Sequence, residues 1–356
     1  MRFSIIFTLL PFIRAFQMSP IKYSIYPPIY TTKKSVDFST KIVHFKKLIR
    51  SESILPTSLL CFTGGFIINP SIVGLLQTPT FLVSTVNTIL IMSSSMIVND
   101  IFDIELDRID HSTRPLVNGD ISMRDAVGYL VGLLSIVEIL NIRFLPDNLQ
   151  TIVHLCIFNI LVYTPIYKKI PFIKNIFCAA MVAFSIFFAG LATSSKELLI
   201  LNPRFSIFAV TLSILFFGSW YNEVLLDMGD IEGDRENRIY TVPVLYGLKN
   251  TWFFSGSLLF FNMISNTLSM YYLFGKNTAI WLPCIFSPMI YQHWNIYKSK
   301  YTNLVIKYSV NRMKNSLFAL VLFLCGLSFI HSGYVFVLPV INWDIHWLNI
   351  ATTVFI

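Results

Sequence analysis

Residues 80–108 read TFLVSTVNTILIMSSSMIVNDIFDIELDR, and residues 205–235 read FSIFAVTLSILFFGSWYNEVLLDMGDIEGDR. Each stretch begins with an apolar run of about 20 residues, the length that an α-helix needs to cross the hydrocarbon core of a bilayer. Each run then ends in a group of aspartates. The two stretches therefore predict membrane-spanning helices that carry acidic side chains at one end.

The two acidic ends are copies of each other. Residues 100–108 (DIFDIELDR) and 227–235 (DMGDIEGDR) are identical at six of nine positions. A Thr-x-Pro-x-x-x-Gly pattern follows each copy, at residues 113–119 and 241–247. An internal repeat of this length, with each copy at the end of an apolar run, predicts two motifs that face each other at the same side of a membrane.

The composition supports a membrane protein. Hydrophobic residues make up 54% of the 356 residues and charged residues only 13%, and the mean hydropathy is +0.65. A soluble domain has about a quarter of its residues charged, so a soluble fold is excluded. We predict an all-α bundle of about nine transmembrane helices, at residues 54–76, 80–98, 121–142, 149–166, 175–195, 205–225, 251–274, 278–297 and 316–340.

The basic residues support this division and give the chain a predicted orientation. With nine spans, 23 of the 27 Lys and Arg fall on the side of the N-terminus and of both acidic motifs. Loops rich in Lys and Arg stay on the cytosolic side, or on the stromal or matrix side in an organelle. The net charge of +8 is therefore a topology signal and not a nucleic-acid surface. The five cysteines and six histidines have no spacing typical of disulfides or zinc sites.

The first 50 residues differ from the rest. A short apolar run at residues 3–12 follows Arg2, which is typical of a targeting leader for a plastid, mitochondrial or endoplasmic reticulum membrane. An interfacial or disordered tail is the alternative. Residues 33–50 form a basic, amphipathic approach to the membrane surface. We therefore divide the chain into a leader segment, residues 1–50, and a membrane domain, residues 51–356.

The acidic motifs predict a metal site. If each motif continues its helix, its three aspartates fall within an arc of roughly 60°. Oxygen ligands without His or Cys suit Mg²⁺, which proteins usually share between carboxylates and substrate phosphates. Two facing stripes would hold a diphosphate between metal ions. The stripes consist of Asp100, Asp103 and Asp107, and of Asp227, Asp230 and Asp234 with Glu223 one turn earlier; Glu105 and Glu232 point away.

These motifs resemble a known family. Residues 99–110 (NDIFDIELDRID), followed by 114–122 (RPLVNGDIS), resemble the first signature of the UbiA superfamily of intramembrane prenyltransferases. Residues 227–247 (DMGDIEGDRENRIYTVPVLYG) resemble the second signature, and residues 163–175 (YTPIYKKIPFIKN) are similar to the segment after the family's fourth helix. The resemblance implies a central cavity with a polar cap that holds both motifs. It also implies Mg²⁺-dependent transfer of a prenyl chain from a polyprenyl diphosphate.

Carried onto this chain, the resemblance gives each site residue a role. The implied catalytic and metal-binding residues are Asp100, Asp103, Asp107, Asp227, Asp230 and Asp234, with Asn99 as a further metal ligand. The implied diphosphate-binding residues are Asn99, Arg108, Lys168, Lys169, Arg235 and Arg50. The family often has Arg-Pro-x-Asn where this chain reads Arg-Ser-Glu-Ser, so the pattern around Arg50 departs from it.

The implied partners are a polyprenyl diphosphate, a lipophilic or aromatic acceptor, and membrane lipid. The acceptor is an aromatic, a tetrapyrrole or a glycerol-phosphate lipid, and the second motif is more similar to the branches acting on glycerol-phosphate lipids, chlorophyllide or homogentisate than to the 4-hydroxybenzoate branch. A terpene cyclase of the same superfamily is the first alternative. A membrane transporter is the second, but it would carry its acids in mid-span. An inactive scaffold is disfavoured because all six motif aspartates are intact.

Overall fold

The computed structural model describes residues 38–331, except 105–106, 109–112, 195–202 and 237–238. In this part of the chain all regular secondary structure is helical, which confirms the predicted all-α fold. The long helices are α3 (Ile54–Ile68), α5 (Pro79–Phe102), α7 (Met123–Phe144), α8 (Asp147–Tyr163), α9 (Ile173–Thr193), α10 (Pro203–Gly229), α12 (Val242–Phe274), α14 (Trp281–Lys298) and α15 (Asn303–Ile330). The short ones are α2 (Phe38–Leu48), η1 (Ser51–Ser53), α4 (Ile72–Leu76), η2 (Tyr167–Lys169), α11 (Ile231–Glu236) and α13 (Lys276–Ala279).

Six segments of the described chain are long and apolar enough to cross a membrane. They are Ser51–Ile68, Pro79–Phe102, Met123–Phe144, Ile173–Thr193, Arg204–Gly229 and Asn303–Ile330. Helices α8, α12 and α14 overlap three further predicted spans but are not among the six. The chain is thus a multi-pass membrane protein, and the predicted number of nine spans is not confirmed.

Two predicted spans have wrong boundaries. The first span, 54–76, is interrupted, because α3 ends at Ile68 and Asn69 is extended. Pro70 explains the break, since a proline disfavours helical geometry in the residue before it and cannot donate a backbone hydrogen bond. The last helix begins at Asn303 and not at residue 316, and residues 332–340 of that predicted span lie outside the described residues.

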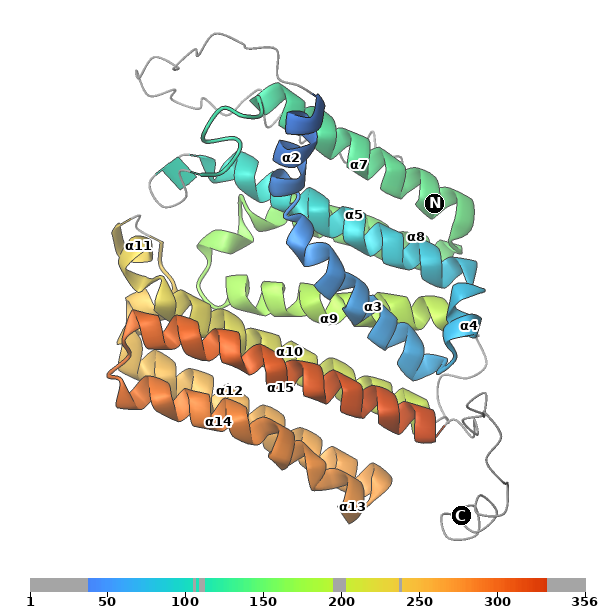
Figure 1. Cartoon of the computed structure of the whole chain (residues 1–356), viewed down its shortest axis with the longest axis vertical. Coiled ribbons are helices and arrows are strands. Elements are labelled where there is room, and N and C mark those ends of the chain that lie inside the picture. Colours follow the sequence, from blue (N-terminus) through green and yellow to red (C-terminus); the bar gives the residue numbers. More distant parts are fainter. Residues whose placement is uncertain (1–37, 105–106, 109–112, 195–202, 237–238, 332–356) are drawn as a thin grey trace.

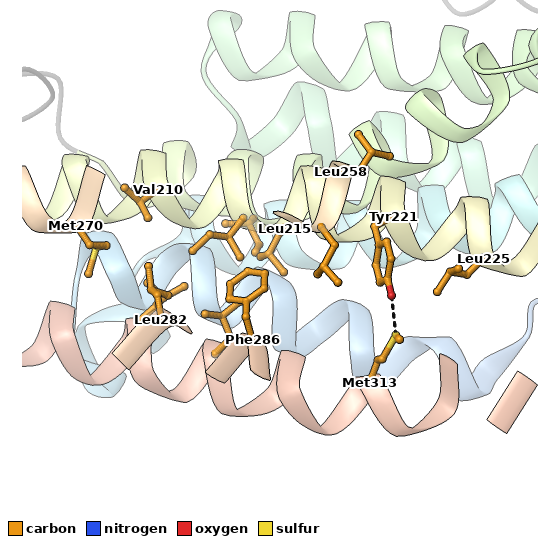
Figure 2. Packing of buried hydrophobic residues seen from close by; sticks show 14 of the residues in the cluster. Val210, Leu215, Tyr221, Leu225, Leu258, Met270, Leu282, Phe286 and Met313 are labelled. Carbon is orange, nitrogen blue, oxygen red and sulfur yellow. Dashed lines mark hydrogen bonds between the residues drawn. The ribbon is translucent and has the colours of Figure 1, made fainter. Parts of the chain in front are cut away.

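The helices form two groups that follow the sequence (Figure 1). In the N-terminal group, α5, α7 and α8 surround one buried apolar cluster that includes Ile97, Leu134 and Val153. In the C-terminal group, α10, α12, α14 and α15 surround another. Figure 2 shows part of this second cluster, in which the hydroxyl group of Tyr221 lies 3.5 Å from Met313 Sδ. Apolar packing of this kind, rather than exclusion of water, holds helices together within a membrane.

Helices α3 and α9 join the two groups and cross at very short range. A Cβ atom at Gly64 would lie 2.2 Å from the carbonyl oxygen of Ile186, and one at Gly190 would lie 3.2 Å from the carbonyl oxygen of Gly64. Only glycine allows this approach, and small residues at such crossings are typical of membrane helix packing. The crossing fixes the two groups, and hence their acidic motifs, relative to each other.

The acidic motifs end up at the same end of the bundle. Helix α5 leads into the first motif and α10 into the second, which continues as α11. Both lie at the left side of Figure 1. Helix α2, from the predicted leader segment, packs at this end as well: Leu48 is fully buried, and the ring centroids of Phe45 and Tyr129 are 4.9 Å apart.

Candidate active site at the motif end of the bundle

The first aspartate of the first motif is buried between two arginines. Asp100 lies in the last turn of α5 and is 3% exposed. Its Oδ1 atom accepts hydrogen bonds from Arg50 Nη2 at 3.1 Å and from Arg114 Nη1 at 3.0 Å. Arg50 adopts a left-handed backbone conformation, with φ of 49°, between α2 and η1. The departure from the family pattern around Arg50 therefore does not remove it from the motif.

Arg114 connects two aspartates of the first motif. The same Nη1 atom that bonds Asp100 also donates to Asp107 Oδ2. Asp107 is 2% exposed, and burial raises its pKa above the ordinary value of an aspartate, while the Arg114 charge opposes that rise. A buried carboxylate is stable as an anion only with such partners. Arg114 thus has a larger structural part in the motif than the sequence indicated.

The remaining polar groups of the first motif contact the end of α8 and η2. Lys168 Nζ forms an ion pair with Asp103 Oδ2, and the Thr164 hydroxyl group donates a hydrogen bond to Asn99 Oδ1. Helix α5 ends at Phe102, so Asp103 and Asp107 lie beyond it and the stripe expected for an unbroken helix is interrupted. Local helical turns persist, because the backbone N–H of Asp107 still bonds Asp103 O at 2.8 Å.

The first aspartate of the second motif has one basic partner and one neutral partner. Asp227 is 4% exposed in the last turn of α10. Lys174 Nζ donates to its Oδ1 atom at 2.6 Å, and Asn175 Nδ2 donates to its Oδ2 atom at 2.8 Å. Both partners come from the first turn of α9. Arg50, just before η1 and α3, and Lys174, in the first turn of α9, thus each pair with the first aspartate of one motif.

The other two aspartates of the second motif are more accessible. The side chain of Asp230 is 63% exposed, and its Oδ1 atom lies 3.4 Å from Lys307 Nζ. Asp234 accepts a hydrogen bond from the Thr241 hydroxyl group at 3.0 Å. Burial raises the pKa of Asp234 to about 6, against the opposing effects of Lys174 and Thr241. Helix α10 ends at Gly229, so this stripe too is interrupted before its second aspartate.

The structure brings most of the predicted site residues together at the motif end of the bundle. The side chains of Arg108 and Arg235 are exposed, and that of Lys169 lies outside the described residues. Residues that contact the motifs without having been predicted as site residues are Arg114, Lys174, Asn175, Thr164, Thr241 and Lys307. The sequence repeat could have indicated two of them, because Arg114 and Thr241 each follow the third aspartate of their motif by seven residues.

The donor atoms fit a hard divalent cation, although the acids are not gathered around one point. The six motif carboxylates are the ligand type that Mg²⁺ prefers. Within the described ranges, no three acidic, His or Cys side chains form a ready metal cluster. Most of the acids are turned toward a basic side chain instead. A cation would have to replace these partners, and the released basic groups would then be available to a diphosphate.

The chain matches known proteins over most of its length. Residues 58–314 match the model of the UbiA prenyltransferase family. The digeranylgeranylglyceryl phosphate synthase of Methanosphaera stadtmanae is 27% identical over 256 residues, which cover 72% of this chain and 82% of that protein. The synthase of the same name from Sulfolobus acidocaldarius is 28% identical over 217 residues, covering 60% of this chain and 74% of that protein.

Solved structures share the fold. A solved structure that concerns digeranylgeranylglyceryl phosphate synthase in membranes superposes on this chain with a TM-score of 0.64 at 21% identity. The match covers 81% of this chain and 98% of that one. A UbiA homolog from Archaeoglobus fulgidus, bound to DMAPP and Mg²⁺, gives a TM-score of 0.56 at 18% identity, over 82% of this chain and all of that one. The apo structure of a UbiA homolog from Aeropyrum pernix K1 gives a TM-score of 0.60 at 16% identity, over 78% of this chain and 97% of that one.

Proposed function

This chain belongs to the UbiA prenyltransferase family and is an integral membrane prenyltransferase. From that premise we propose that it transfers a prenyl chain from a polyprenyl diphosphate to a hydroxyl group of a glycerol-phosphate lipid, with Mg²⁺ as the metal. The observation that supports this most directly is the pair of aspartate motifs, which lie at one end of the bundle among five basic side chains. A diphosphate needs such a balance of metal-binding acids and fixed cations.

The acceptor class rests on the relatives. The similar proteins from Methanosphaera stadtmanae and Sulfolobus acidocaldarius both carry the name of a synthase of a glyceryl phosphate lipid. The use of Mg²⁺ is supported by the Archaeoglobus fulgidus homologs, which were solved with Mg²⁺ and with DMAPP or GPP. The donor atoms described above agree with that metal.

The residues of this chain have the following proposed roles. The six motif aspartates and Asn99 would hold Mg²⁺, which when bound would neutralise charge on the leaving diphosphate. Arg50, Arg114, Lys168 and Lys174 are ion-paired with the aspartates and would turn to the diphosphate oxygens. The apolar bundle beneath the motifs would keep the allylic cation away from water.

The orientation of the chain is part of the proposal. The distribution of Lys and Arg supports a motif end on the cytosolic, stromal or matrix side. The first 50 residues remain a predicted leader segment, of which residues 1–37 lie outside the described part. Labelling of an Arg235→Cys variant in sealed vesicles with an impermeant maleimide tests the orientation, since Arg235 is exposed at the motif end.

The experiment that tests the activity uses purified protein in detergent with radiolabelled geranylgeranyl diphosphate and Mg²⁺. The acceptors are geranylgeranylglyceryl phosphate, homogentisate, chlorophyllide, 4-hydroxybenzoate and a blank. We expect diphosphate release and a prenylated product with geranylgeranylglyceryl phosphate, lost with EDTA and in Asp103→Ala and Asp230→Ala. Asp147→Asn is the matched control, because Asp147 is an exposed aspartate in the first turn of α8, at the other end of the bundle.

Other outcomes assign the chain differently. A hydrocarbon formed in the blank would identify a terpene cyclase, and product with homogentisate or chlorophyllide alone would change the acceptor class. Absence of metal-dependent turnover with donors of several lengths would contradict the proposed activity altogether.

A further inference from the structure

Asn175 is a buried neutral side chain that contacts an aspartate of the second motif directly. It is 1% exposed in the first turn of α9, and its Nδ2 atom donates to Asp227 Oδ2 at 2.8 Å. An ionised carboxylate only accepts hydrogen bonds, so the amide must present its nitrogen to Asp227. The neighbouring Lys174 donates to the other oxygen, Oδ1, at 2.6 Å. The two oxygens of Asp227 thus have partners of different kinds, one neutral and one charged.

The other buried aspartates of the motifs have only charged partners among the side-chain bonds of the described residues. Both partners of Asp100 are arginines, and both donate to the same oxygen, Oδ1. Asp107 accepts from Arg114. A diphosphate attracts such charged donors much more strongly than it attracts a neutral amide. The bond between Asn175 and Asp227 can therefore persist when the charged partners turn to the substrate.

The turn before α9 fixes the place of Asn175. Phe172 precedes this helix with a φ of 64°, a backbone conformation that residues with large side chains seldom adopt. Its ring packs against two rings of α12, Tyr246 and Phe254, with centroids 5.9 and 5.6 Å away. Such a conformation persists only where the surrounding packing holds it, and it is frequent at functional sites. The packing of Phe172 therefore holds the start of α9, and with it the amide group of Asn175.

We propose that Asn175 is a positioning residue that orients Asp227 for Mg²⁺; this inference rests on the proposed function. Asn175 holds Oδ2 of Asp227, so that Oδ1 is the oxygen at which Mg²⁺ takes the place of Lys174. Carboxylates that bind a metal are usually held by hydrogen bonds of their own, and loss of such a partner lowers the metal affinity by about 10- to 100-fold. Asn175 itself contacts neither the metal nor the diphosphate.

The test measures the binding of Mg²⁺ alone to the full-length protein in detergent, by calorimetric titration without substrate. Asn175→Ala is compared with Asn262→Ala. Asn262 is also 1% exposed, and its Nδ2 atom also donates to α10, at 2.9 Å from the carbonyl oxygen of Ile214. Ile214 lies about 20 Å before Asp227 along this helix. Both variants therefore lose a buried amide bond to α10, but only Asn175→Ala loses it at the motif.

We expect Asn175→Ala to weaken Mg²⁺ binding at least about tenfold. Asn262→Ala should keep the wild-type affinity within about threefold, because its site is distant and shares no partner with Asp227. Both variants should unfold at a lower temperature in EDTA, since each loses a buried hydrogen bond. Wild-type Mg²⁺ affinity in Asn175→Ala, or an equal loss in Asn262→Ala, would overturn the proposal.

A second variant covers the case in which Asn175→Ala does not fold. If Mg²⁺ takes the place of Lys174 at Oδ1, then Lys174→Met removes a competing cation and should raise the Mg²⁺ affinity at least about tenfold. Lys307→Met removes an exposed lysine 3.4 Å from Asp230 and should change the affinity less than about fivefold. An unchanged or lower affinity in Lys174→Met would overturn the proposal. If the wild type binds Mg²⁺ but prenylates no acceptor, the proposed function fails instead.

Discussion

The two aspartate motifs are sequence repeats, yet their charges are balanced differently. In the first motif the three aspartates contact three basic side chains: Arg50, Arg114 and Lys168. In the second motif Lys174 is the one partly buried basic partner seen in the described chain, and Lys307 lies at 3.4 Å from an exposed carboxylate. The seventh residue after the third aspartate is Arg114 in one copy and the neutral Thr241 in the other. A sequence repeat can therefore keep its acidic residues while changing the basic residues that balance them.

This difference gives the two motifs different expected tasks. The first motif is close to neutral without a metal, whereas the second keeps excess negative charge, to which Glu223 one turn away adds. We therefore expect the second motif to attract Mg²⁺ more strongly and the first to be the richer source of cations for a diphosphate.

The largest expected effect comes from removing the first aspartate of either motif. Asp100→Asn and Asp227→Asn should each lower kcat/KM by at least about 10²-fold, because each removes a buried carboxylate that is proposed to bind Mg²⁺ and frees its basic partner to bind the diphosphate wrongly. The measurement is product formation with Mg²⁺ in saturating amounts. Full activity in one variant only would show that the two motifs do not act together.

The next effect concerns stability. Arg114→Ala leaves two buried carboxylates without their shared cation, so it should lower the free energy of unfolding by about 3 kcal/mol. The corresponding change in the second motif, Thr241→Val, removes one neutral hydrogen bond and should cost about 1 kcal/mol. Denaturant titration in detergent with EDTA measures both. Equal losses would contradict the difference in charge balance.

A smaller effect should follow from pH. Burial raises the pKa of Asp234 to about 6, and in the proposed site Mg²⁺ would bind its ionised form. Below pH 6 the proton competes with the metal, so the apparent Mg²⁺ affinity should fall about tenfold for each pH unit and level off above pH 7. Calorimetric titration at several pH values measures this, with Asp234→Asn as the control that removes the dependence. If the Mg²⁺ affinity of the wild type did not change with pH, the metal would be bound by ligands other than Asp234.

The smallest effect should come from the exposed pair of the second motif. Lys307 and Asp230 are both more than half exposed, and exposed ion pairs contribute less than about 1 kcal/mol. Lys307→Ala should therefore change the stability by less than that amount and kcat/KM by no more than about threefold. A strong loss of activity would mean that Lys307 contacts a substrate.

The sequence alone predicted the all-α fold and the acidic groups of the site, but not the partners of these groups. The aspartates stand out because the same nine-residue pattern ends two separate apolar runs. Lys174 looked like an ordinary interfacial cation, since its contact with Asp227 joins residues that are 53 positions apart along the chain. The predicted start of α15 was wrong because Lys307 and Arg312 suggested a loop. Both residues are good helix formers, and their long side chains can reach polar surroundings from within a helix.

The built-in basic partners have a consequence for the biogenesis of the protein. Six uncompensated aspartates at the rim of a membrane bundle would repel one another and oppose helix association. Arg50, Arg114, Lys168 and Lys174 neutralise the buried ones from within the same chain. We therefore expect insertion and assembly of the bundle to proceed before any metal is bound, so that the supply of Mg²⁺ governs turnover and not the amount of folded protein in the membrane.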